Sequence, residues 1–265
     1  MKVKAVILDW AGTVVDFGSC APVAAVERVF ARFGVEITSA EARQPMGLLK
    51  RDHIAAVLAM PRVAEAWSNC HGAAPGPAEI DRIYQEFTPL QVQEIPNHAE
   101  LIPGVLAAVN FLRDRGVRIG TTTGYTRPML QPLVGKAAAQ GYRPDATVTP
   151  DEVGVGRPAP FMILENLVRL QVWPPAAVVK VGDTPVDIEE GRNAGVWTVA
   201  VAATGNELAL SRHEFEVLSA ADRELRVQAA RERLRAAGAH WVVDTLDELP
   251  GVIDAIEALP ETALL

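Results

Sequence analysis

Cysteine is scarce in this sequence: Cys20 and Cys70 are the only two among its 265 residues. Two cysteines cannot build a disulfide framework, which makes a reducing compartment the expected setting. Hydrophobic runs are short as well, and none approaches the ~18 apolar residues of a membrane-spanning helix. The N-terminal stretch MKVKAVILDWAG meets an acid after a few apolar residues, unlike a signal peptide. We therefore expect a cytoplasmic protein with no membrane association.

Basic residues are in the minority. Lys and Arg number 25 against 33 Asp and Glu, which gives a formal net charge of -8. A nucleic-acid-binding surface is basic, so this balance argues against a nucleic-acid partner. It does not exclude an anionic small molecule, because the local field of a pocket can oppose the net charge. With 49% hydrophobic and 22% charged residues, the composition is that of a globular protein.

The apolar runs that are present end in polar or glycine-rich turns. They are VKAVILD, VRIGTTTG, AAVVKVGD, VWTVAVAATG and HWVVDTL. Most are continuously apolar, which is typical of parallel strands that are covered on both faces. Helical patterns such as GVLAAVNFLRDRG, PFMILENLVRL and DIEEGRNAG lie between them. This alternation predicts an open α/β sheet.

One long interval breaks the alternation. Between Gly18 and Ala99 the sequence has helical patterns and no convincing strand, and Thr38 or Ser39 is placed to cap one of the helices. This insert is far longer than the usual connection of 2–6 residues between a strand and a helix. Ligands of open α/β sheets bind at the carboxyl ends of the strands, so we expect the insert to cover the site. Near the C-terminus, LSAADRELRVQAARERLRAAG predicts a charged surface helix.

Residues with reactive or ligating side chains follow the predicted strands. They are Asp9 after the first run, Thr122 and Thr123 after the second, and Asp183 and Asp187 after the third, with Arg157 in the intervening GRPAP. The carboxyl ends of parallel strands meet at one edge of a sheet, so these side chains converge. Carboxylates from separate strands suit a hard divalent cation such as Mg²⁺. A carboxylate held in line with a phosphoryl group can attack it and become an aspartyl-phosphate.

Four motifs in order resemble those of the haloacid dehalogenase superfamily: ILDWAGTVVD, TTTGYT, GRPAP and VGDTPVDIEEGRNAGVWTV. The resemblance implies a Rossmann-like core with a parallel sheet, made of residues 1–17 and 100–265, and an inserted α-helical cap domain of residues 18–99. The site roles that it implies are Asp9 as nucleophile, Thr123 as phosphoryl-binding hydroxyl, Arg157 as the basic group of the third motif, Asp183 as Mg²⁺ ligand, and Asp187 and Thr13 as supporting residues.

The sequence departs from the superfamily at Ala11. Its phosphatases carry a second aspartate at this position, which protonates the departing alkoxide and later activates water. Two explanations are open for Ala11. Either the activity is lost, or the leaving group is not an oxygen.

A second resemblance, centred on the predicted cap, addresses this departure. The stretch RQPMGLLKRDH puts Lys50 and His53 three residues apart, on one face of a helix. Together with DWAGT, TTGYT and GRPAP it resembles the phosphonoacetaldehyde hydrolase family, from the first strand to about Gly205. The resemblance implies that Lys50 forms a Schiff base with a substrate aldehyde and that the backbone carbonyl of Ala11 helps to hold Mg²⁺. It also implies a homodimer that forms through the cap domains, and a place in the degradation of 2-aminoethylphosphonate.

The chemistry of a carbon–phosphorus bond agrees with this pattern. A carbanion is a very poor leaving group, but an iminium on the neighbouring carbon can accept the electron pair. No alkoxide departs, so no acid is needed at position 11. Lys50 must be neutral to attack, and burial can lower its pKa from about 10.4. His53 is a candidate for proton transfer. Five further residues are expected to line the substrate pocket: Met46, Gly47, Gly124, Tyr125 and Cys20.

Two other functions stay open at this point. A phosphatase or phosphomutase acting on a phosphate ester would explain Asp9, Thr123 and Asp183, although Ala11 and Lys50 count against it. A non-catalytic phosphoryl-binding protein would explain the missing acid at position 11, although intact Asp9 and Asp183 count against it. A screen of phosphate esters and a Mg²⁺-dependent turnover assay would separate these functions.

Overall fold

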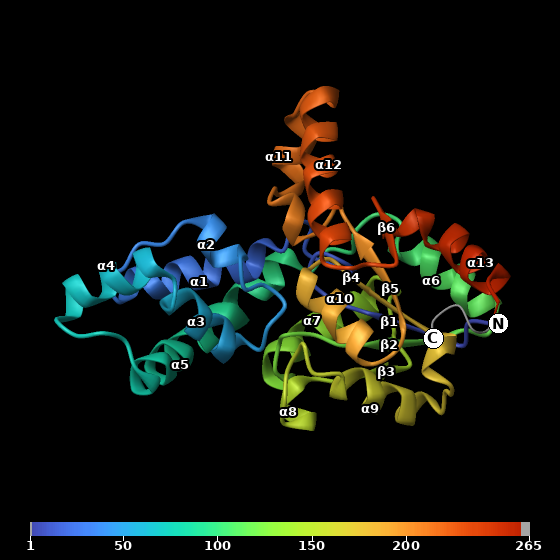
Figure 1. Cartoon of the computed structure of the whole chain (residues 1–265), viewed down its shortest axis with the longest axis horizontal. Coiled ribbons are helices and arrows are strands. Elements are labelled where there is room, and N and C mark those ends of the chain that lie inside the picture. The colour runs from blue at the N-terminus through green and yellow to red at the C-terminus, as the bar shows by residue number, and fades with distance from the viewer. Residues whose placement is uncertain (1, 261–265) are drawn as a thin grey trace.

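A six-stranded sheet lies at the centre of the protein in a computed structural model that describes residues 2–260 (Figure 1). Its strands are β1 (Ala5–Leu8), β2 (Arg118–Thr121), β3 (Ala146–Thr147), β4 (Val178–Gly182), β5 (Trp197–Val201) and β6 (Trp241–Val243). All neighbours pair in parallel, in the order β3-β2-β1-β4-β5-β6. The predicted α/β class and the five predicted strands are confirmed. The edge strand β3 was missed because two half-buried residues carry no apolar run.

Helices cover both faces of the sheet. The helices outside the insert are α6 (Val105–Asp114), α7 (Arg127–Ala139), α8 (Pro150–Val153), α9 (Phe161–Leu170), α10 (Pro185–Asn193), α11 (Arg212–Val217), α12 (Ala220–Ala236) and α13 (Leu249–Ala258). The alternation of side chains along β1 separates the two layers. Ala5 and Ile7 join a buried cluster with residues of α9, whereas Val6 and Leu8 join a cluster with residues of α6 and α13. Four consecutive apolar residues therefore suit a strand that is buried on both sides.

The helical insert follows β1 and extends to one side of the sheet (Figure 1). It comprises α1 (Cys20–Arg32), α2 (Ser39–Arg43), α3 (Lys50–Leu58), α4 (Pro61–His71) and α5 (Pro77–Glu94), followed by the 3-10 turn η1 (Ile95–His98). Thr38 caps α2 in a capping box with Glu41, as one of the two predicted alternatives. Ion pairs of Arg28 with Glu94 and of Arg32 with Glu86 connect α1 to α5. The insert thus has its own helical packing.

The C-terminal part adds helices whose pattern is less regular. In Figure 1, α11 and α12 project from the rest of the fold. The predicted charged helix is α12, which buries only the stripe Val227, Ala230 and Leu234. The remaining short 3-10 turns are η2 (Pro175–Ala177), η3 (Asn206–Leu208) and η4 (Leu246–Glu248). Among the described residues, every helix is too short or too polar to cross a bilayer. Residues 261–265 of the predicted core lie outside the described residues.

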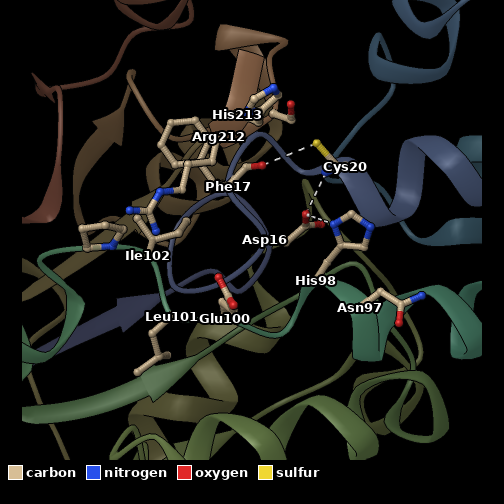
Figure 2. A pocket seen from close by; sticks show the side chains of 12 residues that line it. Asp16, Phe17, Cys20, Asn97, His98, Glu100, Leu101, Ile102, Arg212 and His213 are labelled. Atoms are coloured by element: carbon tan, nitrogen blue, oxygen red, sulfur yellow. Dashed lines mark hydrogen bonds and ion pairs between the residues drawn. The ribbon is translucent and has the colours of Figure 1, made fainter. Parts of the chain in front are cut away.

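Two chain segments connect the insert to the sheet, and Asp16 ties them together (Figure 2). The Asp16 carboxylate accepts hydrogen bonds from the backbone N–H groups of Cys20 and Ala21, at 2.9 and 3.0 Å, and so caps the start of α1. The same carboxylate lies 3.2 Å from Nδ1 of His98, on the returning segment. One side chain therefore fixes both connections relative to each other.

Replacement of His98 by glutamine is expected to destabilise the protein mainly at low pH. The hydrogen bond to Asp16 raises the pKa of His98. A raised folded-state pKa stabilises the fold fully below the unfolded value of about 6.5, and this contribution is lost as the pH rises through the folded pKa. We expect a loss of about 1 kcal/mol near pH 5.5 and less near pH 9, as measured by denaturant unfolding. His213→Gln is the control, because His213 lines the same cavity as Asp16 and His98. Equal losses at both pH values would contradict the role of the ion pair.

Candidate active site

The residues that follow β1, β2 and β4 line one cavity at the carboxyl edge of the sheet. This is the point at which the strand order reverses around β1, where open α/β sheets bind their ligands. The cavity is narrow, with a volume of about 20 Å³. Most of the residues that were predicted for the site line it: Asp9, Ala11, Met46, Gly47, Lys50, Thr123, Gly124, Tyr125, Arg157 and Asp183. Sheet and insert thus contribute side chains to the same small space.

Two glycines allow the insert to approach the sheet this closely. A Cβ atom at Gly124 would lie 2.5 Å from the backbone oxygen of Leu48. Gly47 has a φ of +94°, and a Cβ atom there would lie 2.6 Å from Oγ1 of Thr184. A larger residue at Gly124 would push the two backbone segments apart, and one at Gly47 would collide with Thr184 and strain the backbone. The loop that precedes α3 therefore lies directly on the catalytic edge.

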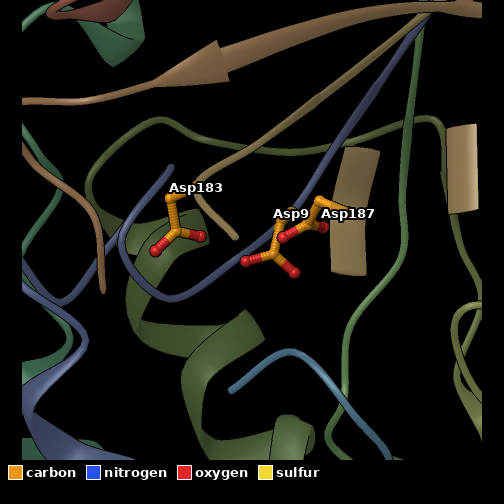
Figure 3. Close-up of side chains that lie close together, drawn as sticks. All are labelled: Asp9, Asp183 and Asp187. Carbon is orange, nitrogen blue, oxygen red and sulfur yellow. The ribbon is translucent and has the colours of Figure 1, made fainter. Parts of the chain in front are cut away.

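Three buried carboxylates gather at this edge, with Asp9 between Asp183 and Asp187 in the view of Figure 3. One oxygen from each lies within 4.8 Å of the others. Burial raises the pKa of Asp9 and raises that of Asp183 well above its usual range, and the mutual repulsion of the carboxylates adds to both effects. Asp183 accepts hydrogen bonds from Asn206 N–H at 2.7 Å and from Ser19 Oγ at 3.1 Å. Oγ1 of Thr13, which was predicted to support the site, donates to it at 3.3 Å.

Two buried cations stand behind the carboxylates. Arg157 places Nη2 2.7 Å from Asp9 and Nη1 2.9 Å from Asp187, and Nζ of Lys180 lies 2.8 Å from Asp187. Burial alone would raise the pKa of Asp187, but the charges of Arg157 and Lys180 outweigh it and lower this pKa to about 2. Asp187 is therefore held as an anion by protein cations and does not line the cavity.

The charges of this group fit a divalent cation. Arg157 and Lys180 balance Asp187 and Glu190, to which both cations are also paired. Asp9 and Asp183 remain as two buried carboxylates that face the cavity. Paired carboxylate oxygens are the ligands that hard divalent cations prefer, and a cation would remove the repulsion between them. Asp9 and Asp183 are thus suited to hold such a metal.

Lys50 enters the cavity as the first residue of α3. Its side chain is 2% exposed, lies 3.7 Å from Sδ of Met46 and stands over the ring of Tyr125 at 5.5 Å. Burial lowers the pKa of Lys50 to about 8, against the opposing charge of Asp9. A substantial fraction of this amine is therefore neutral near physiological pH, as a nucleophilic lysine requires.

His53 lies one turn further along α3 and does not line the cavity. Its Nε2 is 2.8 Å from the carbonyl oxygen of Ala42, so this nitrogen carries a proton and donates it. Burial, followed by the charge of Lys50, holds the pKa of His53 well below its usual range. Nδ1 is buried without a hydrogen-bond partner. The imidazole is therefore neutral, with one free acceptor.

The structure does not bring Cys20 to the candidate active site. Cys20 lines a different cavity, at the connection between insert and sheet, where Sγ donates to the carbonyl oxygen of Phe17 (Figure 2). The cause is the backbone before α1, where Asp16 and Ser19 both have positive φ values, of 57° and 51°. The expectation that Cys20 lines the substrate pocket is corrected accordingly. Its neighbour Ser19 lines the active-site cavity instead.

Sequence reasoning overlooked two buried charged residues of this region, Lys180 and Glu190. Both lie within structural elements, Lys180 in β4 and Glu190 in α10, and both are fully buried. A lysine inside the apolar run VVKVG was the available signal, because a buried charge needs a partner of opposite sign.

Comparison with known proteins agrees with this geometry. The family described as haloacid dehalogenase-like hydrolase matches residues 3–195, and a related hydrolase family matches residues 154–249. The chain belongs to the haloacid dehalogenase-like hydrolases.

Relatives narrow the assignment within this superfamily. The chain is 48% identical to a phosphonoacetaldehyde hydrolase of Paraburkholderia phytofirmans, over 97% of this chain and 96% of the relative. It is 45% identical to one of Bacillus cereus, over 97% of both chains. A crystal structure of a phosphonoacetaldehyde hydrolase-like protein from Oleispira antarctica has a TM-score of 0.95 at 41% identity, covering 97% of this chain and 93% of that one. Within the superfamily, the chain thus falls in the family of these phosphonoacetaldehyde hydrolases.

Proposed function

We propose that this protein hydrolyses the carbon–phosphorus bond of phosphonoacetaldehyde to acetaldehyde and phosphate, with Mg²⁺ as its metal. The observation that carries the proposal is a buried lysine of lowered pKa in the same cavity as a strand-end aspartate. The names of the relatives support the same substrate. Ala11 supports it too, because its methyl group can protonate no leaving group.

In the first step, neutral Nζ of Lys50 attacks the aldehyde carbon. Water leaves, and a protonated imine joins Lys50 to the substrate. The free Nδ1 of His53 is available to accept a proton during this condensation, relayed through bound water or Lys50 itself. The face of the Tyr125 ring lies beside Nζ and stabilises the positive charge that develops on it.

In the second step, a carboxylate oxygen of Asp9 attacks phosphorus. The electron pair of the carbon–phosphorus bond moves into the iminium, and the two-carbon fragment leaves as an enamine on Lys50. We expect Thr123 and Arg157 to bind phosphoryl oxygens, since both residues line the cavity. Mg²⁺, held by Asp9, Asp183 and the carbonyl oxygen of Ala11, would neutralise phosphoryl charge when bound.

In the last step, water hydrolyses the aspartyl-phosphate and releases phosphate. The enamine takes up a proton on carbon, and hydrolysis of the resulting iminium releases acetaldehyde and regenerates Lys50. Asp187 and Thr13 support Arg157 and Asp183 throughout. Residues 18–99 act as a cap domain on a core of residues 1–17 and 100–265. The homodimer through the caps, the cytoplasmic location and the part in 2-aminoethylphosphonate degradation stay predictions.

The pH dependence of imine formation follows from the pKa of Lys50. Because burial lowers this pKa to about 8, the amine is protonated at lower pH and neutral above it. The rate of imine formation at subsaturating substrate should rise as the pH increases through about 8 and then level off. Stopped-flow quenching with cyanoborohydride measures this rate. A midpoint near 10.4, the ordinary value for lysine, would contradict a desolvated amine.

The function is tested by borohydride trapping read by peptide mass spectrometry. The protein is incubated with phosphonoacetaldehyde and Mg²⁺ and then reduced. We expect a two-carbon adduct on the peptide that contains Lys50, together with loss of activity. Release of phosphate from simple phosphate esters without any adduct would instead identify an ordinary phosphatase of the superfamily. Absence of turnover with either substrate class would favour a phosphoryl-binding protein.

A further inference from the structure

The guanidinium of Arg157 is held by protein groups on nearly every side. Nη2 donates to Asp9 at 2.7 Å and to Oγ1 of Thr122 at 2.6 Å. Nη1 faces Asp187 at 2.9 Å, and Nε donates to Glu190 at 2.9 Å. A guanidinium has five N–H groups, which exceeds these contacts with four protein groups, so donor capacity is left for a ligand. The orientation of Arg157 is therefore set before any substrate enters.

Thr122 is the point at which these contacts meet. Its hydroxyl oxygen accepts from Nη2 of Arg157 and, at 2.9 Å, from Nζ of Lys180. The hydroxyl itself donates to Oε2 of Glu190 at 3.0 Å. One hydroxyl proton and two lone pairs are all that a threonine offers, so every one of them is used. Thr122 is completely buried and does not line the active-site cavity.

Lys180 and Glu190 complete a closed network behind the cavity. Nζ of Lys180 donates to Thr122 and forms ion pairs with Asp187 at 2.8 Å and with Glu190 at 3.4 Å. Oε2 of Glu190 accepts hydrogen bonds from Nε of Arg157 and from the hydroxyl of Thr122, and it is ion-paired with Nζ of Lys180. The network joins residues beside or within β2, β4 and α10, which the fold keeps in fixed register. Such an arrangement is rigid because no member can move without breaking several charge-assisted bonds.

We propose that Thr122, together with Lys180 and Glu190, is a positioning residue that holds Arg157 at one oxygen of Asp9. This inference rests on the proposed role of Asp9 as nucleophile. Without the Thr122 hydroxyl, Nη2 keeps Asp9 as its only acceptor, and the guanidinium can turn toward a two-point pairing with that carboxylate. Such pairing would occupy both nucleophilic oxygens and remove Arg157 from the phosphoryl group. The loss therefore falls on the phosphoryl-transfer step and not on the reaction of Lys50 with the aldehyde.

The matched variants Thr122→Val and Thr122→Ser test this proposal. Valine keeps the shape of threonine and removes the hydroxyl, whereas serine keeps the hydroxyl and removes a methyl group. For Thr122→Val we expect kcat to fall about 10- to 100-fold, a loss typical of a misplaced catalytic group, with KM changed less than about threefold. Borohydride trapping at Lys50 should proceed as in the unmodified protein. Thr122→Ser should restore kcat to within about threefold of the original value.

Two results would overturn the proposal: an unchanged kcat in Thr122→Val, or an equal loss in Thr122→Ser. Thermal unfolding shows whether Thr122→Val is folded, and if it is not, Glu190→Gln is measured in its place. That variant weakens the hold on Nε and should lower kcat with the same pattern. If the unmodified protein cleaves only phosphate esters, the variants are compared with p-nitrophenyl phosphate. Arg157 and Asp9 act on the phosphoryl group there too, so failure of the proposed substrate is distinguished from failure of the network.

Discussion

Replacing Lys50 with arginine will reduce phosphate release from phosphonoacetaldehyde by at least about 10³-fold, the scale expected when a covalent catalyst is removed. Arginine retains a positive charge beside the Tyr125 ring, but its guanidinium stays protonated and is no nucleophile. The variant therefore cannot form the imine, and the carbon–phosphorus bond keeps its poor leaving group. Phosphate release measured with a coupled colorimetric assay, together with borohydride trapping, gives both readouts.

Lys2→Arg is the matched control for this substitution. Lys2 is exposed and lies outside the active-site cavity, so its replacement should leave turnover and trapping unchanged. The fold of Lys50→Arg is checked by thermal unfolding. Retention of most of the activity in Lys50→Arg would refute the imine mechanism and leave Lys50 as a residue that merely binds charge.

Replacing Asp9 with asparagine should separate the two steps that Lys50→Arg abolishes together. We expect phosphate release to fall by at least about 10³-fold while the imine at Lys50 still forms and can be trapped. An amide oxygen can still accept from Nη2 of Arg157, but it cannot act as the nucleophile toward phosphorus. Quantitative mass spectrometry of the reduced peptide, with and without Asp9→Asn, measures the adduct.

Stability provides a second readout for Asp9→Asn. Burial and the neighbouring Asp187 raise the pKa of Asp9, so its charged form destabilises the folded protein in the absence of metal. Without Mg²⁺, the free energy of unfolding of Asp9→Asn should therefore equal or exceed that of the unmodified protein. The exposed Asp114, at the end of α6, supplies the control Asp114→Asn. A large loss of stability in Asp9→Asn would show that the carboxylate is mainly structural, and loss of the trapped adduct would contradict the separation of the two steps.

The catalytic edge could be predicted because parallel strands dictate it. Asp9, Thr123 and Asp183 each follow a largely apolar strand pattern, and any parallel arrangement of these strands brings their ends together. The roles of Arg157 and Lys50 followed from resemblance, since both lie in connections whose path no periodicity describes. The same limit applies to the short helices α8 and α11, whose few residues give little periodic signal.

Other features depend on contacts that are distant in sequence. Lys180 is buried because Asp187 and Glu190 from the next helix face it, and neither partner is evident from the strand alone. The direction of Cys20 depends on two residues with positive φ before α1, at positions where glycine is not present. Cys20 does lie at the predicted connection between core and insert, but its side chain faces the other cavity there. His53 lies on the same helix as Lys50 and three residues after it, as expected, but the contact of its ring with the carbonyl of Ala42 could not be read from the sequence.

The tight contact at Gly47 and Gly124 determines how the two parts of the candidate site are joined. Asp9 directly follows strand β1 of the sheet, whereas Lys50 is carried by a segment inserted between the first two strands. A Cβ atom at Gly124 would lie 2.5 Å from the backbone oxygen of Leu48, in the segment that leads to Lys50. The two glycines therefore set how closely the segment that carries Lys50 can approach the edge of the sheet that carries Asp9.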